Sequence, residues 1–263
     1  MRGWRTAVLV VLLAACGSNE GQRQQEPIQP PPQSAAVEPR DGRTRAAAHT
    51  ELGSAYFGQG NLGVALEEAK IALEADSTYA PAHNLLGLIY MELKQPEMAR
   101  TAFEDALRID PRDSDANHNM GHFLCETGHE LEGVKYFMTA VQNPLYASPA
   151  KSYTGAGACY EKAGHMDDAF GDYARAIRLD PNYVPAMLPY ARLLMAKGQL
   201  DEARVLVNRY NTKTAPTAES LWLLVRIEQR RGDARSARDV AGMLGQRFPD
   251  SKEYSSFQRG DFN

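Results

Sequence analysis

Residues 80–113 read APAHNLLGLIYMELKQPEMARTAFEDALRIDPRD, and this stretch decides the fold. Small residues stand twelve positions apart at Gly87 and Ala99, and an aromatic residue, Phe103, follows about one helical turn later. Small side chains let two antiparallel helices approach closely, and a large ring fills the space beside them. Pro111 cannot continue a helix, and it extends the residue before it. The stretch therefore predicts a hairpin of two helices that ends at this proline.

The same spacing recurs in phase along most of the chain. A small or apolar residue returns every 34 positions, with one interval of 36, at Gly53, Gly87, Gly121, Gly157, Ala191 and Val225. A second small residue follows twelve positions later, at Ala65, Ala99, Gly133, Ala169, Ala203 and Ala237. A helix–turn–helix unit of about 34 residues with this pattern is a tetratricopeptide repeat (TPR). The sequence predicts an all-α fold, a right-handed superhelix of six helix–turn–helix repeats.

The repeat phase also sets the boundaries of the units. They are 46–79, 80–113, 114–147, 150–183, 184–217 and 218–251. Ser148 and Pro149 are inserted between the third and fourth units, which predicts a longer loop there. The last two units are the most degenerate, as suits the capping end of a repeat array. Residues 252–263 are expected to form a C-terminal tail or a short helical cap.

The first 15 residues have the layout of an export signal. Arg2 and Arg5 precede a short apolar run that cannot span a bilayer as a stable helix. The run ends in Leu13-Ala14-Ala15-Cys16, which resembles the lipobox of bacterial lipoproteins. The resemblance implies covalent lipid on Cys16, and no other cofactor is expected; the alternative is an ordinary cleaved signal with a chance cysteine. Gly17 in place of an aspartate favours an outer-membrane lipoprotein that faces the periplasm.

Residues 16–45 are expected to be a disordered tether that follows the lipidated cysteine. They are rich in proline and glutamine and hold no aromatic residue, so they cannot bury enough apolar surface to offset the entropy of ordering. A proline run favours an extended, semi-stiff spacer between membrane and body. The alternative is a proline-rich ligand for another protein.

The charge balance limits the classes of partner. The formal net charge is −4, and removal of residues 1–15 takes away two arginines and no acid, which leaves −6. Because phosphate binding needs clustered Lys and Arg, nucleic acid is not expected as a partner. The sequence also holds no recognisable nucleophile–base pair and no phosphate-binding loop, so we expect a binding protein and not an enzyme.

The first helix of each unit is expected to line the inner wall of the superhelix. Unit positions 2, 5, 9 and 12 face inward, and in units two to four they lack the several Lys and Arg that would clamp a ligand's carboxylate terminus. We expect this wall to bind an extended segment or short helix of a partner protein. The alternative is a merely solvated face. The candidate groove residues at these positions are Asn84, Leu88, Met91, His118, His122, Thr154 and Glu161.

Two cysteines remain after Cys16. Cys125 and Cys159 lie on the first helices of units three and four, and an even pair in an oxidising compartment favours a disulfide. One alternative is a pair of buried free thiols. Another is a zinc site formed by His118, His122 and the two cysteines. No glutamate base accompanies the histidines, so we do not expect a metal site.

Two segments resemble one family of proteins. Residues 117–125, NHNMGHFLC, and 155–164, GAGACYEKAG, resemble the third- and fourth-repeat cysteine segments of type IV pilus biogenesis lipoproteins of the PilF/PilW type. The resemblance implies a pilotin at the outer membrane that helps the pilus secretin (PilQ-type) to insert and multimerise. It adds Asn117 and Asn119 to the expected binding wall, and we expect a monomer. The alternatives are a scaffold for cell-wall hydrolases and a zinc hydrolase.

Overall fold

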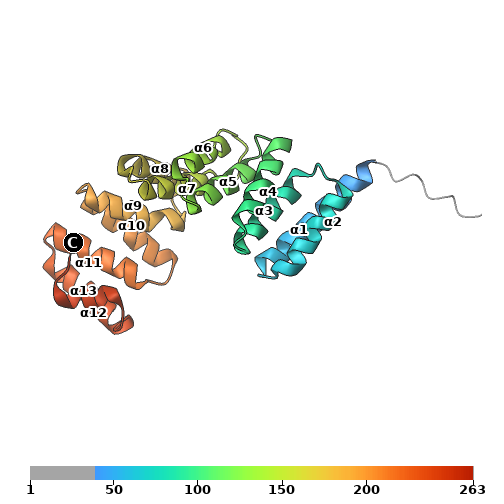
Figure 1. Ribbon diagram of the computed structural model, residues 1–263. Coiled ribbons are helices and arrows are strands. Elements are labelled where there is room, and N and C mark those ends of the chain that lie inside the picture. Colours follow the sequence, from blue (N-terminus) through green and yellow to red (C-terminus); the bar gives the residue numbers. More distant parts are fainter. Residues whose placement is uncertain (1–38, 263) are drawn as a thin grey trace, which may run out of the picture. The chain divides into compact units, whose positions relative to one another are not determined.

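The structure is a computed structural model, and it describes residues 39–262 (Figure 1). The predicted signal peptide 1–15, the lipid site Cys16 and the tether up to residue 38 lie outside the described residues. Within the described part, no helix is long and apolar enough to cross a membrane.

The described residues form thirteen α-helices and no strand, which confirms the all-α fold class. Twelve helices form six consecutive pairs, one pair in each predicted unit, and the last helix follows them. Their bounds are α1 Pro39–Gly58, α2 Leu62–Ala75, α3 Ala80–Glu92, α4 Pro96–Ile109, α5 Ser114–Glu126, α6 Glu130–Ala140, α7 Pro149–Lys162, α8 Met166–Leu179, α9 Val184–Ala196, α10 Leu200–Lys213, α11 Ala218–Arg231, α12 Ala234–Arg247 and α13 Lys252–Arg259.

The first helix begins earlier than the sequence predicts. Residues 39–45 belong to α1, so the prediction of a tether up to residue 45 is wrong for this stretch. The extension has partners at the far end of the hairpin, because Arg43 forms an ion pair with Asp76 at 3.6 Å and lies over the ring of Tyr79. These contacts give the additional turns of α1 a surface to pack on, so the helix does not end at the unit boundary.

The spacing of small and aromatic residues has the packing role that the sequence predicts. Phe103 and Tyr173 are almost fully buried, and each ring lies against a glycine of the preceding helix. A Cβ atom at Gly87 would stand 2.4 Å from the Phe103 ring, and one at Gly157 would stand 2.9 Å from the Tyr173 ring. Any side chain there would force the two helices of the pair apart.

The turn between the two helices of a pair repeats as well. In five units a glycine stands at this turn with φ between +76° and +83°, at Gly60, Gly128, Gly164, Gly198 and Gly232. Unit two has Lys94 at the same place, with φ of +57°. A positive φ favours glycine because it has no Cβ, so Lys94 carries the only strained backbone of this kind among the described non-glycine residues.

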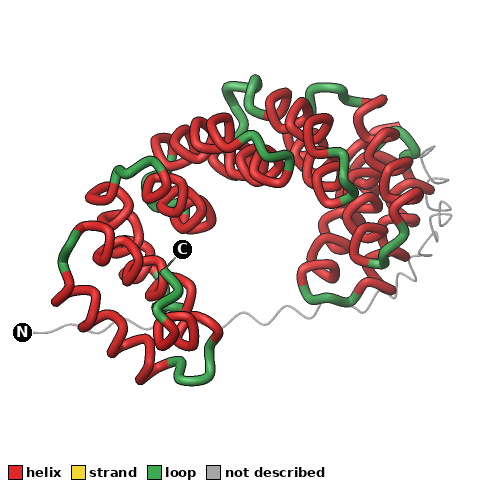
Figure 2. Tube along the Cα trace, turned by 60° about the vertical axis from the view of Figure 1, so that its left-hand side comes forward, coloured by secondary structure: helices red, strands yellow, loops and turns green. Residues whose placement is uncertain are grey.

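The pairs stack on one another, and Figure 2 shows this stack of helices joined by short loops. First helices of neighbouring units contact one another, as α3 does with α5 and α5 with α7. They therefore form the inner wall of the stack, while the second helices lie behind them. At the C-terminal end, α13 packs on α11 and α12 as a short cap, with the ring of Tyr254 against Gly245.

Candidate functional site

The predicted binding residues lie on three neighbouring first helices. Helix α3 carries Asn84, Leu88 and Met91, and α5 carries the predicted residues between 117 and 122. Helix α7 carries Thr154 and Glu161. The inner wall therefore brings all three helices into one surface. The structure divides the predicted residues into those that face this surface and those that are used inside the fold.

Asn84 and Asn119 lie together on the inner wall. The amide of Asn119 donates from Nδ2 to Oδ1 of Asn84 at 3.0 Å, which joins α5 to α3. Both side chains are half-buried. Within residues 39–262, the Nδ2 of Asn84 and the Oδ1 of Asn119 make no further hydrogen bond. The NH₂ group of Asn84 and the carbonyl oxygen of Asn119 thus remain for a partner as a donor group and an acceptor group, the two kinds of group that an extended backbone segment requires.

A recess lies between the end of α3 and α5, about one helical turn beyond Asn119 and about two beyond Asn84. Its volume is about 660 Å³, and we call it the α3–α5 recess. Its apolar wall holds Met91 and Phe123, and Leu88 packs into the adjoining core cluster. The residues that line it are Met91, Glu92, Lys94, Pro96, His122, Phe123, Glu126 and Thr127. A pocket with an apolar floor and a polar rim suits one apolar side chain of a bound peptide.

His122 faces this recess, as the sequence predicts for an inner-wall residue. Its burial between the helices lowers its pKa, an effect that the nearby Glu126 opposes. The imidazole is therefore mostly neutral at pH 7, when one ring nitrogen donates and the other accepts. Glu126 is held by Lys162 of α7 at 2.6 Å, and hydrogen bonding to Lys162 lowers the pKa of its carboxyl group.

Asn117 does not line the inner wall, which corrects the expectation drawn from the family resemblance. Its side chain is 2% exposed. Its amide donates to the carbonyl oxygens of Pro111 at 3.0 Å and Asp113 at 2.7 Å, so it holds the loop that enters α5. A substitution here would disturb the loop and not a ligand contact.

His118 is also inside the fold, although its unit position matches that of Asn84. Its ring packs edge-on against Phe137, and its Nδ1 lies 2.9 Å from the hydroxyl of Ser152 on α7. Burial, and to a lesser extent the charges of Lys151 and His122, lowers the pKa of His118 to about 3. The neutral imidazole thus serves the joint between units three and four and is not available to a ligand.

The two predicted residues on α7 are already engaged. Thr154 donates its hydroxyl to the carbonyl of Ala150 at 2.8 Å. Glu161 accepts hydrogen bonds from the Tyr173 hydroxyl at 2.7 Å and from Arg192 at 2.9 Å. The Thr154 bond lies within α7, whereas Glu161 links α7 to α8 and α9, so the hydroxyl proton of Thr154 and the carboxylate of Glu161 already have partners inside the fold.

Cys125 and Cys159 form a disulfide that joins α5 to α7, with their Cα atoms 5.6 Å apart. Both residues are buried. The bridge takes up the two sulfur atoms that a zinc site would need, and His118 is turned toward Ser152. Among the described residues, no group of three or more His, Cys, Asp or Glu side chains could hold a metal ion.

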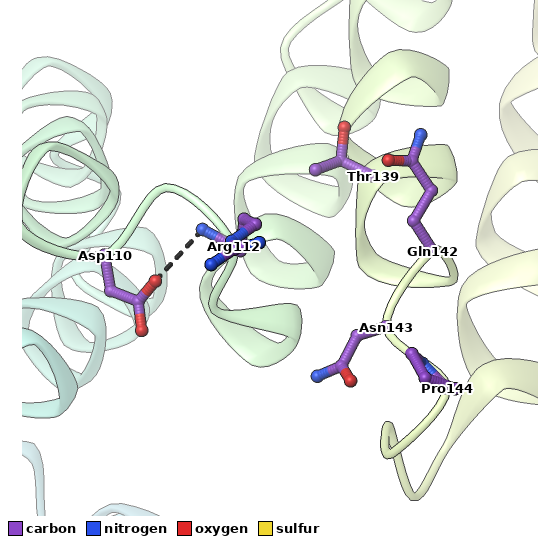
Figure 3. A pocket seen from close by; sticks show the side chains of 6 residues that line it. All are labelled: Asp110, Arg112, Thr139, Gln142, Asn143 and Pro144. Atoms are coloured by element: carbon purple, nitrogen blue, oxygen red, sulfur yellow. Dashed lines mark hydrogen bonds between the residues drawn. The ribbon is translucent and has the colours of Figure 1, made fainter.

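A second cavity lies at the loop that the two-residue insertion lengthens. Figure 3 shows Asp110 and Arg112 on one side of it and Gln142, Asn143 and Pro144 on the other, and its volume is about 470 Å³. The Arg112 amide donates to Asp110 at 3.1 Å within their own turn. Thr139, the one hydroxyl in the lining, donates to the carbonyl of Lys135. This lining offers no nucleophile with an adjacent base.

The sequence reasoning missed three inner-wall residues in the last two units. Arg192 and Arg226 occupy unit position 9, as His122 does, and Trp222 occupies position 5, as Asn84 does. The expectation of a wall poor in basic residues concerned units two to four, and further along the wall carries an arginine at position 9 of each of the last two units. The repeat phase could have identified these three residues, because unit positions 5 and 9 are assigned to the inner wall.

Comparisons with known proteins agree with this architecture. Models of the tetratricopeptide repeat match residues 80–113 and 160–220, and the predicted TPR fold is confirmed. The type IV pilus assembly protein PilF of Pseudomonas aeruginosa is 27% identical over 218 residues, which are 82% of this chain and 86% of PilF.

Two solved structures are similar over most of the chain. The structure of PilW, described as a widely conserved type IV pilus biogenesis factor, has a TM-score of 0.71 at 28% identity and covers 81% of this chain and 98% of PilW. The structure of Pseudomonas aeruginosa PilF has a TM-score of 0.77 at 26% identity and covers 83% of this chain and 99% of PilF.

Proposed function

We propose that this chain, a tetratricopeptide repeat protein homologous to PilF and PilW at 27–28% identity over most of its length, acts in type IV pilus biogenesis as a pilotin. In this role it is a lipoprotein of the outer membrane that binds the pilus secretin (PilQ-type) and promotes its localisation and multimerisation there. The homology supports the pilus role, and the secretin as partner rests on the family resemblance of the two cysteine segments.

The binding surface in this proposal is the inner wall of α3 and α5. The Asn84–Asn119 pair presents a free donor group, the NH₂ of Asn84, and a free acceptor group, the carbonyl oxygen of Asn119, which suit the backbone of an extended segment. The α3–α5 recess begins about one helical turn beyond Asn119 and about two beyond Asn84, and it would take an apolar side chain of the same segment. This adjacency of a free amide pair and an apolar recess is the observation that carries the proposal.

Rigidity of the surface supports the same proposal. The disulfide and the His118–Ser152 contact fix α5 against α7, so α5 presents its side chains in one arrangement. A surface that is ordered before binding loses less conformational entropy when a partner docks. The expected monomer suits this geometry, because the inner wall then remains free for the secretin.

The membrane anchor completes the proposed mechanism. Lipid on Cys16 would hold the chain at the membrane, since each buried CH₂ contributes about 0.8 kcal/mol. The residues between Cys16 and α1 would then let the inner wall search a limited volume, which raises its effective concentration toward a secretin subunit at the same membrane. Both statements concern residues outside the described part of the chain.

Deletion of the gene tests the proposal as a whole. We expect the loss of heat-resistant secretin multimers on a blot and the loss of twitching motility, both restored by the full chain. A Cys16→Ala variant should be expressed but should restore multimers poorly, because it lacks the anchor. Unchanged multimers in the deletion strain would contradict the proposal, and co-purification of cell-wall hydrolases instead would identify the chain as a hydrolase scaffold.

A further inference from the structure

The inner wall changes its chemistry in units five and six. Arg226 and Arg230 of α11 donate only to backbone carbonyls, at 3.2 Å to Phe262 and 3.3 Å to Met195. None of the ion pairs within residues 39–262 includes either arginine, whereas neighbouring Arg192 is paired with Glu161. Burial and repulsion from Arg230 and Arg192 lower the pKa of the Arg226 guanidinium. Arg226 and Arg230 thus have no carboxylate partner among the described residues, although Glu219 of the same helix lies 4.0 Å from Arg192, and the chain as a whole carries a net charge of −4.

The chain's own C-terminal residues lie on this part of the wall. The ring of Phe262 stacks on Trp222 with centroids 5.5 Å apart, and its carbonyl accepts the hydrogen bond from Arg226. Gly260, with φ of +75°, turns the chain back after α13. Trp222 and Arg226 occupy the unit positions that Asn84 and His122 occupy at the first surface. The tail therefore sits where a bound peptide would.

Residues 260–262 contact the aromatic ring of Trp222 but bring no carboxylate to Arg226 or Arg230. The tail's aromatic ring and one backbone carbonyl contact the surface, whereas the carboxylate of Asp261, the one side-chain carboxylate among residues 260–262, pairs with Arg259 at 2.8 Å. Guanidinium groups, such as those of half-buried Arg226 and exposed Arg230, bind carboxylates that they can contact with two hydrogen bonds. An acidic group placed beside the aromatic position would meet Arg226 and Arg230, which the tail leaves unmatched.

We propose that Trp222, Arg226 and Arg230 form a second peptide-binding site, which takes an extended segment of a partner protein carrying an aromatic residue next to carboxylates. Residues 260–262 occupy its aromatic position until the partner segment displaces them. The site is separate from the surface on α3 and α5, and it does not depend on the secretin being the partner there. Occupancy by the tail lowers the apparent affinity, which equals the intrinsic affinity multiplied by the fraction of molecules that are open.

Fluorescence anisotropy tests the site directly. The probe is a labelled synthetic peptide with two glutamates followed by a phenylalanine, titrated with the full chain and with its Phe262→Ala variant. We expect the variant to bind about tenfold more tightly, because the aromatic position is vacated. In the Phe262→Ala background, Arg226→Gln should reduce binding about tenfold. A probe with glutamines in place of the glutamates should also bind less tightly.

Arg238→Gln is the matched control, since Arg238 is an exposed arginine of α12 that donates to a backbone carbonyl of its own helix. It should leave binding unchanged. A thermal unfolding curve for each variant reports whether the cap remains folded, and a chain that ends at Gly260 gives a second way to vacate the site. The proposal is overturned if neither tail variant binds the probe more tightly, or if Arg226→Gln and Arg238→Gln behave alike.

Discussion

The joint between units three and four and the joint between units five and six are held by different chemistry. At the first, a disulfide joins α5 to α7, and His118 meets Ser152 inside the fold. At the second, two ion pairs join α10 to α11, Arg204 with Glu228 at 2.6 Å and Asp201 with Arg231 at 2.8 Å, and Glu228 also meets Arg231 within α11. The first joint has a covalent bridge that salt does not weaken, beside one exposed ion pair between Glu126 and Lys162, whereas the polar contacts of the second are ionic. The stiffer joint adjoins the surface that we propose for the secretin.

Removal of the disulfide should have the largest effect on stability. The Cys125→Ala, Cys159→Ala double variant opens a loop with a sequence separation of 34 residues. The chain-entropy model gives a loss of about 3–4 kcal/mol in the free energy of unfolding. Urea denaturation measures it, with the wild-type chain under reductant as a second route to the same state. If the double variant unfolds at the wild-type urea midpoint, the bridge does not stabilise this joint.

A fall in pH should lower the free energy of unfolding through His118, which lies at the joint between units three and four. Its pKa is about 3 in the fold against 6.5 for an unperturbed histidine, so the unfolded chain binds the proton and the native chain does not. This contribution to stability is complete above pH 6.5 and is lost progressively as the pH falls toward 3. Between pH 7.5 and pH 5 the loss should be about 2 kcal/mol.

The His118→Asn variant provides the control for the pH effect. Asparagine keeps a hydrogen-bonding side chain but does not titrate, so the pH dependence over this range should flatten. Urea denaturation at several pH values compares the two slopes. Equal slopes for the two proteins would show that another group causes the acid sensitivity.

Removal of the buried charge at the joint between units five and six should lower the free energy of unfolding by a smaller amount, and this loss should depend on salt. Glu228 has a side chain that is 3% exposed, and Glu228→Gln removes the charge that both arginines meet. We expect a loss of about 1–2 kcal/mol that shrinks at high salt. Asp201→Asn is the matched control, because Asp201 pairs with the same Arg231 but is 85% exposed, and it should cost about 0.5 kcal/mol or less. Equal losses for the two variants would contradict the role of burial at this joint.

The repeat phase predicts the helix pairs because the contacts that define them are local. Gly87 and Phe103 meet within one hairpin, so their spacing alone specifies how α3 and α4 pack. The start of α1 could not be found in this way. It depends on Arg43 reaching Asp76 and Tyr79 at the other end of the hairpin, a contact that no repeat position encodes.

The site was predictable only in part, for a similar reason. Asn84 and Asn119 face the inner wall as expected, but His118, at the same unit position as Asn84, is covered by Ser152 and Phe137. The difference arises at the joint that carries the insertion and the disulfide, where the neighbouring unit packs over α5. Trp222 and Arg226 could have been found, because the same phase places them on the inner wall.

Binding of the secretin by the inner wall of α3 and α5 is the central claim, and purified components test it most directly. The full chain is immobilised, and the affinity of a PilQ-type secretin is compared for the wild type, the Asn84→Ala, Asn119→Ala double variant and the His122→Ala variant. Asn208→Ala is the control, since Asn208 is an exposed asparagine of α10. We predict that the double variant binds at least about tenfold more weakly, with a smaller loss for His122→Ala and none for the control. Wild-type affinity in both inner-wall variants would contradict the claim.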